Sequence, residues 1–152
     1  MPQHENAKSV VYWMQRDVRT VDNWALLFAA HLAERAKVPL HVIHVLPPPP
    51  QSSTTDDDHP PSLVDLPMTE RHGAFLLGGL QLVHEELKAK SVPMHILNPL
   101  SHRLVASTIH SQIIEEFQPA VAVCDFTPIR HVRPWMEDKV KEYLESSNIP
   151  LW

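Results

Sequence analysis

The chain has 152 residues, of which 43% are hydrophobic and 20% charged, and this length and composition suit one globular domain over residues 1–152. Its formal net charge of −5 argues against a general nucleic-acid binder. The single cysteine, Cys124, excludes an internal disulfide, and no apolar run reaches the roughly 20 residues that span a membrane. We therefore expect a soluble, intracellular protein that does not insert into membranes.

The first strand and helix are marked by a change in hydrophobic pattern. Residues 9–14 are mostly β-branched or aromatic, which is typical of a strand. Asp22 is a natural N-cap, and a proline soon after the apolar stripe ends it, so a helix is predicted from about residue 23 to 36. The apolar residues at helical spacing within it are Trp24, Leu27, Phe28 and Leu32.

A second strand and an insertion follow. Residues 40–46, LHVIHVL, have the length and composition of a strand, and the four prolines after them end it because proline has no N–H to donate. Residues 47–67 contain seven prolines, four aspartates and no aromatic residue. Such a segment buries too little apolar surface to become ordered, so we interpret residues 47–67 as a flexible surface insertion.

Residues 69–90 predict the longest helix. Its apolar residues at helical spacing are Phe75, Leu76, Leu80, Val83 and Leu87. Gly78 and Gly79 lie in its middle, where each is about 1 kcal/mol less favourable than alanine, so we expect close packing of the helix backbone on the sheet to compensate. A short strand is predicted directly after it, over residues 94–97.

The last third of the chain continues the alternation. Helices are expected over residues 104–117 and 135–144, on either side of an apolar strand over residues 120–126. Within that strand Cys124 is expected as a buried small hydrophobe, and residues 148–152 resemble the beginning of another strand. The predicted fold class is α/β, Rossmann-like and doubly wound, with a five-stranded parallel sheet, helices on both faces and a fifth strand truncated at the C-terminus.

Two loops carry charged residues where doubly wound sheets usually bind ligands. That place is outside the carboxyl ends of the strands at which the strand order reverses, commonly the first and the fourth. Arg16 and Arg19 follow the first strand, and Arg130 and Arg133 follow the fourth. Because a guanidinium both pairs bidentately and stacks, this crevice would suit an anionic or planar partner.

A structural alternative stays open for the first loop. Arg16 and Arg19 can form ion pairs with Asp17 or Asp22 that fasten the loop to the start of the helix. The two interpretations are compatible with each other. A glycine-rich phosphate loop is excluded more firmly, because all three glycines of the chain lie well beyond the first turn.

Three segments resemble the DNA photolyase family in the same order. Residues 12–30, YWMQRDVRTVDNWALLFAA, look like the opening strand, loop and helix of a photolyase, and the DNWALL stretch resembles class II cyclobutane pyrimidine dimer photolyases in particular. Residues 71–87, RHGAFLLGGLQLVHEEL, and 124–135, CDFTPIRHVRPW, agree as well. The resemblance covers nearly the whole chain.

The resemblance implies the N-terminal α/β domain of a photolyase, which can hold an antenna chromophore such as a deazaflavin. The family binds FAD in a later helical domain, which is absent from this sequence, so the chain is not expected to repair cyclobutane dimers alone. The helical domain or its equivalent is the expected partner, and DNA is contacted only indirectly. The candidates for crevice, cofactor or domain contact are Arg16, Asp17, Arg19, Asn23, Asp125, Phe126 and Arg130.

Other chemistry is less well supported by the sequence. His41 and His44 are three apart on a strand and therefore face opposite sides, and neither a metal-ligand spacing nor a hydrolase motif is found. No catalytic residue and no metal ligand is assigned. The tryptophans expected to serve core or domain-interface packing are Trp13, Trp24, Trp135 and Trp152.

Two alternatives come from other functional classes. The chain could be a free-standing nucleotide-binding or stress-type α/β domain whose likeness to photolyases reflects ancestry only. It could also be a protein-interaction module that forms a homodimer through the face that the helical domain would cover, which an oversized apolar patch would support.

Overall fold

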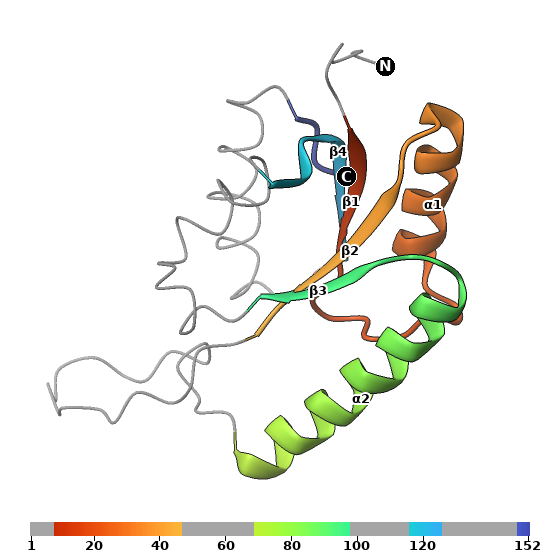
Figure 1. Ribbon diagram of the computed structural model, residues 1–152. Helices are drawn as coiled ribbons and strands as arrows, with labels where there is room; N and C mark the ends of the chain where they lie inside the picture. The colour runs from red at the N-terminus through yellow and green to blue at the C-terminus, as the bar shows by residue number, and fades with distance from the viewer. Residues whose placement is uncertain (1–7, 47–68, 98–115, 126–148) are drawn as a thin grey trace, which may run out of the picture.

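Four parallel strands and two helices make up the part of the chain that the structure, a computed structural model, describes: residues 8–46, 69–97, 116–125 and 149–152. The elements in chain order are β1 (Ser9–Trp13), α1 (Trp24–Ala36), β2 (Leu40–Val45), α2 (Glu70–Ala89), β3 (Met94–Leu97) and β4 (Pro119–Cys124) (Figure 1). The sheet order is β3-β2-β1-β4, and every pairing is parallel. This confirms the predicted α/β class and places the reversal of strand order between β1 and β4.

The described residues form four strands where five were predicted. Of the expected fifth strand, only Leu151 pairs with Ala122 of β4, in parallel. The N–H of Cys124 donates to the carbonyl of Trp152 at 2.7 Å, and Pro150 has no N–H with which to lengthen the ladder. The insertion at 47–67 and nearly all of the two later helices lie outside the described residues.

α1 begins at a different cap from the one predicted. Asn23, in extended conformation, accepts the N–H of Leu26 at 2.8 Å through its side-chain oxygen. Asp22 has φ 52°, a left-handed conformation, whereas a helix N-cap uses extended backbone. The prediction that Asp22 caps the helix is therefore wrong. At the other end Lys37 closes the helix in the left-handed conformation, two residues before Pro39.

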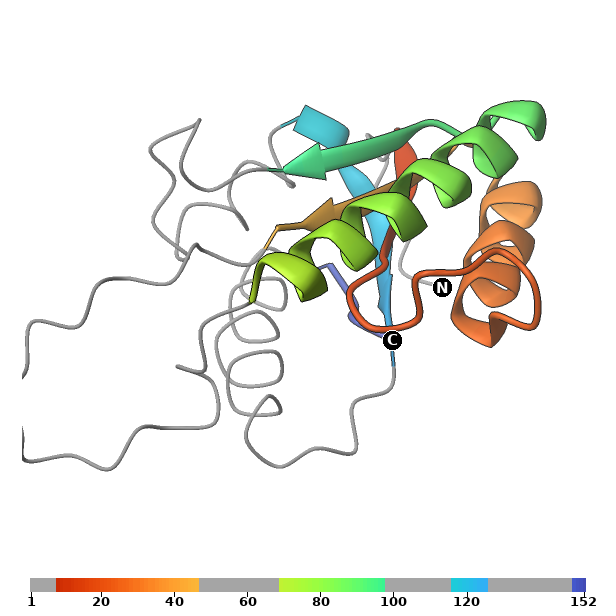
Figure 2. The same ribbon diagram turned by 90° about the horizontal axis from the view of Figure 1, so that it is seen from below.

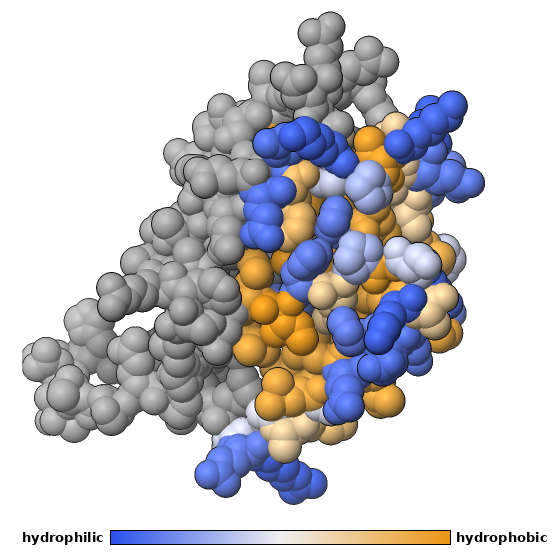
Figure 3. Space-filling view, in the orientation of Figure 1, coloured by the Kyte–Doolittle hydropathy of each residue, from blue (hydrophilic) through white to orange (hydrophobic). Residues whose placement is uncertain are grey.

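α2 begins and ends within one residue of its predicted bounds, but its glycines do not have the predicted role. A Cβ placed on Gly78 would meet no described atom within 4 Å, and one placed on Gly79 would meet Val18 at an ordinary 3.8 Å. Close packing of the helix backbone on the sheet therefore does not compensate the low helix propensity of the two glycines. Phe75, expected on the buried stripe, is 85% exposed. Figure 3 shows apolar side chains at the surface around β3 and α2.

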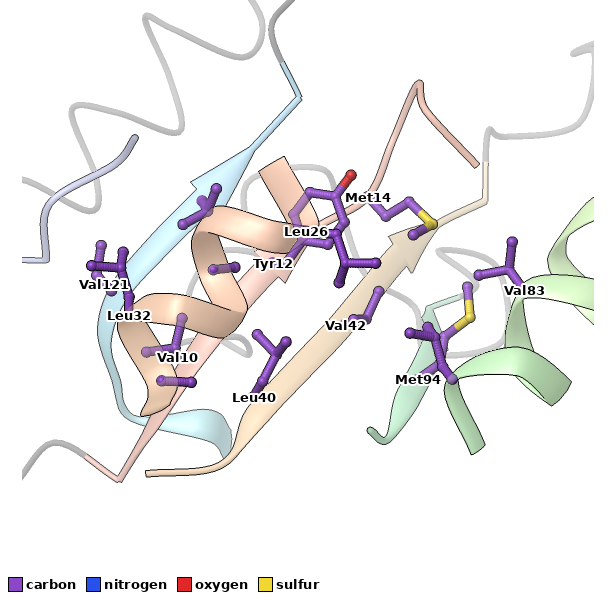
Figure 4. Packing of buried hydrophobic residues seen from close by; sticks show 14 of the residues in the cluster. Val10, Tyr12, Met14, Leu26, Leu32, Leu40, Val42, Val83, Met94 and Val121 are labelled. Atoms are coloured by element: carbon purple, nitrogen blue, oxygen red, sulfur yellow. The ribbon is translucent and has the colours of Figure 1, made fainter. Parts of the chain in front are cut away.

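The core lies on both faces of the sheet, as the alternation of side chains along strands requires. One face, with Val10, Tyr12 and Val42, packs against both α1 and α2 (Figure 4). The connections from β1 to β2 and from β2 to β3 both move in the same direction across the sheet. Since crossovers between parallel strands have the same, right-handed sense, both helices lie on this face. The other face includes Trp13 and Ile43. Helices on that second face stay a prediction, since the segments expected there lie outside the described residues.

Candidate functional site

A pocket of about 440 Å³ opens beside the carboxyl ends of β1 and β4, where the strand order reverses. Figure 2 looks toward this edge, with the loop after β1 running between the two helices. The pocket is lined by Arg16, Asp17, Trp24, Ala25, Phe28, Val123, Cys124, Asp125 and Trp152. Doubly wound sheets bind ligands at this point, because the loops after the two diverging strands leave a crevice.

Aromatic side chains form much of the open side of the pocket. Trp24 is 82% exposed and Trp152 is 66% exposed. The ring of Phe28 meets that of Trp152 edge to face, with centroids 6.1 Å apart. Large exposed aromatic rings gathered around a hollow are typical of a binding surface rather than of ordinary protein exterior.

Asp125 fastens the loop after β1 to the end of β4. Its Oδ2 accepts the backbone N–H groups of Gln15, Arg16 and Asp17 at 2.9, 2.6 and 2.9 Å. Its Oδ1 accepts the hydroxyl of Tyr12. Hydrogen bonds to an ionised acceptor are the strong ones in proteins. This one carboxylate, only 3% exposed, therefore fixes the position of the loop.

Asn23 and Tyr12 extend the network under the loop. The side-chain amide of Asn23 donates to the Tyr12 hydroxyl oxygen at 2.8 Å and to the carbonyls of Asp17 and Arg19 at 3.0 and 3.1 Å. Burial first, and then the hydrogen bond to Asp125, raise the pKa of the Tyr12 hydroxyl far above its ordinary value. Tyr12 consequently stays protonated and donates to the carboxylate at any physiological pH.

Three of the predicted candidates come together at the pocket: Arg16, Asp17 and Asp125. Asn23 lies buried in the network that supports the loop. Arg19 lies outside the pocket lining, with its guanidinium 3.9 Å from the Asp17 carboxylate.

The first loop also contains the ion pairs considered as its structural alternative. Arg16 lies 3.6 Å and Arg19 lies 3.9 Å from Asp17. All three side chains are more than a third exposed, so each pair contributes at most about 1 kcal/mol to stability. The remaining candidates, Phe126 and Arg130, lie outside the described residues.

The aromatic residues that line the pocket, Trp24, Phe28 and Trp152, are not among the site residues predicted from the sequence. Trp13 lies in the core, which confirms one expectation, but Trp24 and Trp152 are too exposed for core packing. The available signal was the pair Trp24 and Phe28, four residues apart directly after a charged loop. Cys124, expected to be buried, is only half-buried and lines the pocket.

Histidines elsewhere on the sheet do not form a metal centre within the described ranges, where no group of three or more potential ligands occurs. His41 and His44 do face opposite sides. His41 lies 3.1 Å from His95, nitrogen to nitrogen, and His44 donates from Nδ1 to the carbonyl of Met14 at 2.8 Å. No helix in those ranges is long and apolar enough to cross a membrane.

The fold is shared with solved structures of low sequence similarity. A protein of the universal stress protein family from Burkholderia pseudomallei superimposes with a TM-score of 0.50 at 13% identity, covering 99% of this chain and 96% of that chain. At this identity the likeness concerns the fold alone.

The sequence itself identifies the family. The family model described as DNA photolyase matches residues 10–152. The deoxyribodipyrimidine photo-lyase of Potorous tridactylus is 34% identical over 134 residues, covering 88% of this chain and 21% of that protein. The Arabidopsis thaliana photo-lyase is 26% identical over 162 residues, covering 99% of this chain, which spans 28% of the relative's length. The chain therefore belongs to the DNA photolyase family.

Proposed function

We propose that this chain is the N-terminal α/β portion of a class II-like cyclobutane pyrimidine dimer photolyase and that its pocket holds a planar antenna chromophore, such as a deazaflavin. The observation that carries the proposal is the aromatic pocket at the reversal of strand order, with Arg16 in its lining. In this proposal a helical FAD-binding domain is the partner, DNA is contacted through that domain, and light-dependent repair belongs to the assembled photolyase.

The residues of the pocket fit a planar pigment. Its volume of about 440 Å³ lies in the range of small-molecule sites, roughly 300–1,000 Å³. Trp24 and Trp152 offer apolar ring area, and the guanidinium of Arg16 can stack on a ring or pair with an anionic substituent. When bound, such a pigment would supply blue-light absorption and energy transfer to a flavin of the assembled photolyase.

A titration of the purified chain with deazaflavin, followed by absorption and fluorescence, tests the proposal. We expect saturable binding that weakens about tenfold in Arg16→Ala, a loss of about 1.4 kcal/mol of binding free energy. Arg19→Ala should weaken it less, because Arg19 lies outside the lining. Arg35→Ala, in the last turn of α1, is the charge-matched control. Equal losses in all three variants would contradict the site.

Parallel titrations separate the alternatives. Tight binding of ATP without binding of deazaflavin would favour a free-standing nucleotide-binding domain. Repair of thymine dimers under blue light by the chain alone would contradict the assignment of the chemistry to a separate helical domain.

A further inference from the structure

The backbone of the loop after β1 forms a nest for an anion. Three consecutive N–H groups, from Gln15, Arg16 and Asp17, converge on one oxygen of Asp125 at 2.6–2.9 Å. Successive N–H groups that converge on one point are the arrangement with which proteins hold phosphate groups. Here the nest is built without a glycine, and a carboxylate from β4's end occupies it.

The same carboxylate is held from its other side. Its second oxygen accepts the hydroxyl of Tyr12, a residue with no exposed surface, which itself accepts a hydrogen bond from Asn23. Asp125 nevertheless lines the pocket. The carboxylate thus lies at the boundary between the core and the pocket, with donors engaging both of its oxygens.

We propose that Asp125 determines which ligands the pocket accepts, because its carboxylate takes the position that a ligand phosphate would take in the loop after β1. This inference rests on the proposed ligand pocket. The three N–H donors are already engaged, and a second anion brought beside the carboxylate would be repelled. The positive charge of Arg16 and Arg19 is partly offset by Asp17, which pairs with both. The pocket therefore selects ring ligands that are not held through a phosphate at this turn.

Removal of the side chain should turn the nest into an open anion site. Asp125→Ala frees the three N–H groups and leaves a space that joins the pocket. The melting temperature of the variant should be lower than that of the wild-type protein. Formate or inorganic phosphate should raise it again by several degrees in a saturable way, compared with chloride at equal ionic strength. The wild-type protein should respond to formate no more than to chloride. The ratio of ATP affinity to deazaflavin affinity should rise about tenfold or more in the variant.

Two variants show whether the effect belongs to the nest. Tyr12→Phe removes a hydrogen bond to the same carboxylate but leaves the carboxylate in place, so it should lower the melting temperature with no response to formate. Asp125→Asn fills the space with a neutral group and should likewise show no response. A formate response in either variant, or none in Asp125→Ala, overturns the proposal.

The outcome does not depend on the stability of the alanine variant. If Asp125→Ala is unfolded in chloride, the same titration is followed by circular dichroism, and recovery of native signal with formate is the expected result. If neither formate nor inorganic phosphate restores the native signal, the proposal is overturned. Failure of the wild-type chain to bind deazaflavin would refute the proposed function and leave the formate result standing, so the two failures are distinguishable.

Discussion

The two faces of α1 carry apolar side chains in opposite surroundings. On one face, Leu26, Ala29, Leu32 and Ala33 are buried against the sheet. On the other, Trp24, Leu27 and Phe28 are exposed, and two of these three line the pocket. Spacing of three and four residues identifies a helix, but it does not tell which of two apolar stripes is the buried one. The comparison separates residues that hold the fold together from residues available to a ligand.

The buried face should give the largest loss of stability. Leu32→Ala removes most of a side chain that packs between α1 and the sheet, and a Leu→Ala change in a core lowers the free energy of unfolding by about 2–5 kcal/mol. Urea denaturation measures the loss. The deazaflavin affinity of the remaining folded protein should stay the same. A loss below about 1 kcal/mol would mean that this face is not the core face of the helix.

The exposed face should show the reverse result. Trp24→Ala should change the free energy of unfolding by no more than about 0.5 kcal/mol, because the indole is mostly in water already. It should weaken deazaflavin binding about tenfold, since the ring contributes apolar area to the pocket. Leu27→Ala is the matched control, because Leu27 is 55% exposed on the same helix but does not line the pocket. Equal binding losses in both variants would contradict the pocket.

Much of the fold could be predicted from the sequence, because strand and helix periodicities do not depend on distant contacts. The predicted bounds of the short strand over 94–97 and of the long second helix lie within one residue of those of β3 and α2. The role of Asp125 could not be derived in this way, since the three N–H groups it accepts lie more than 100 positions earlier in the chain. A carboxylate at the end of a strand is compatible with either a ligand contact or a loop cap. The three hydrogen bonds from the loop show that Asp125 is a loop cap.

The same limit applies to the caps and the aromatic residues. Asp22 and Asn23 are both good N-cap residues, and the choice between them follows from a buried network in which Asn23 donates to two loop carbonyls and to the Tyr12 hydroxyl of β1. The fate of Trp24 follows from its place beside the reversal of strand order, which periodicity does not encode. Family resemblance supplied the fold and the proposed cofactor, but not these contacts.

The core side of the sheet can also be tested through pH. Burial lowers the pKa of His44, which is 1% exposed, and also lowers that of His41 and His95 on the opposite face. At these three histidines the folded state therefore binds protons less readily than the unfolded chain. Their contribution to the free energy of unfolding should be fully present above about pH 6.5, the pKa of histidine in the unfolded chain. It should decline as the pH falls below this value.

The expected decline in the free energy of unfolding is of the order of 1 kcal/mol between about pH 7.5 and 5.5, measured by urea denaturation. His44→Gln, which can still donate to the carbonyl of Met14, should flatten the dependence, and His41→Gln should flatten it less, because His41 is less deeply buried. A wild-type protein that becomes more stable on acidification would contradict the assignment.

The smallest change in the free energy of unfolding should come from the C-terminal cap of α1, which fixes where the helix and both of its faces end. Lys37 closes the helix with φ 56°, a conformation that strains any residue with a Cβ, and its N–H donates to the carbonyls of Ala33 and Glu34. Lys37→Gly keeps these bonds and should raise the free energy of unfolding by about 0.5–1 kcal/mol, with deazaflavin binding unchanged. Lys90→Gly is the matched control at the end of α2, since Lys90 has φ −95° and its replacement should destabilise the protein. Stabilisation by both changes would show that the gain does not arise from relief of the left-handed conformation.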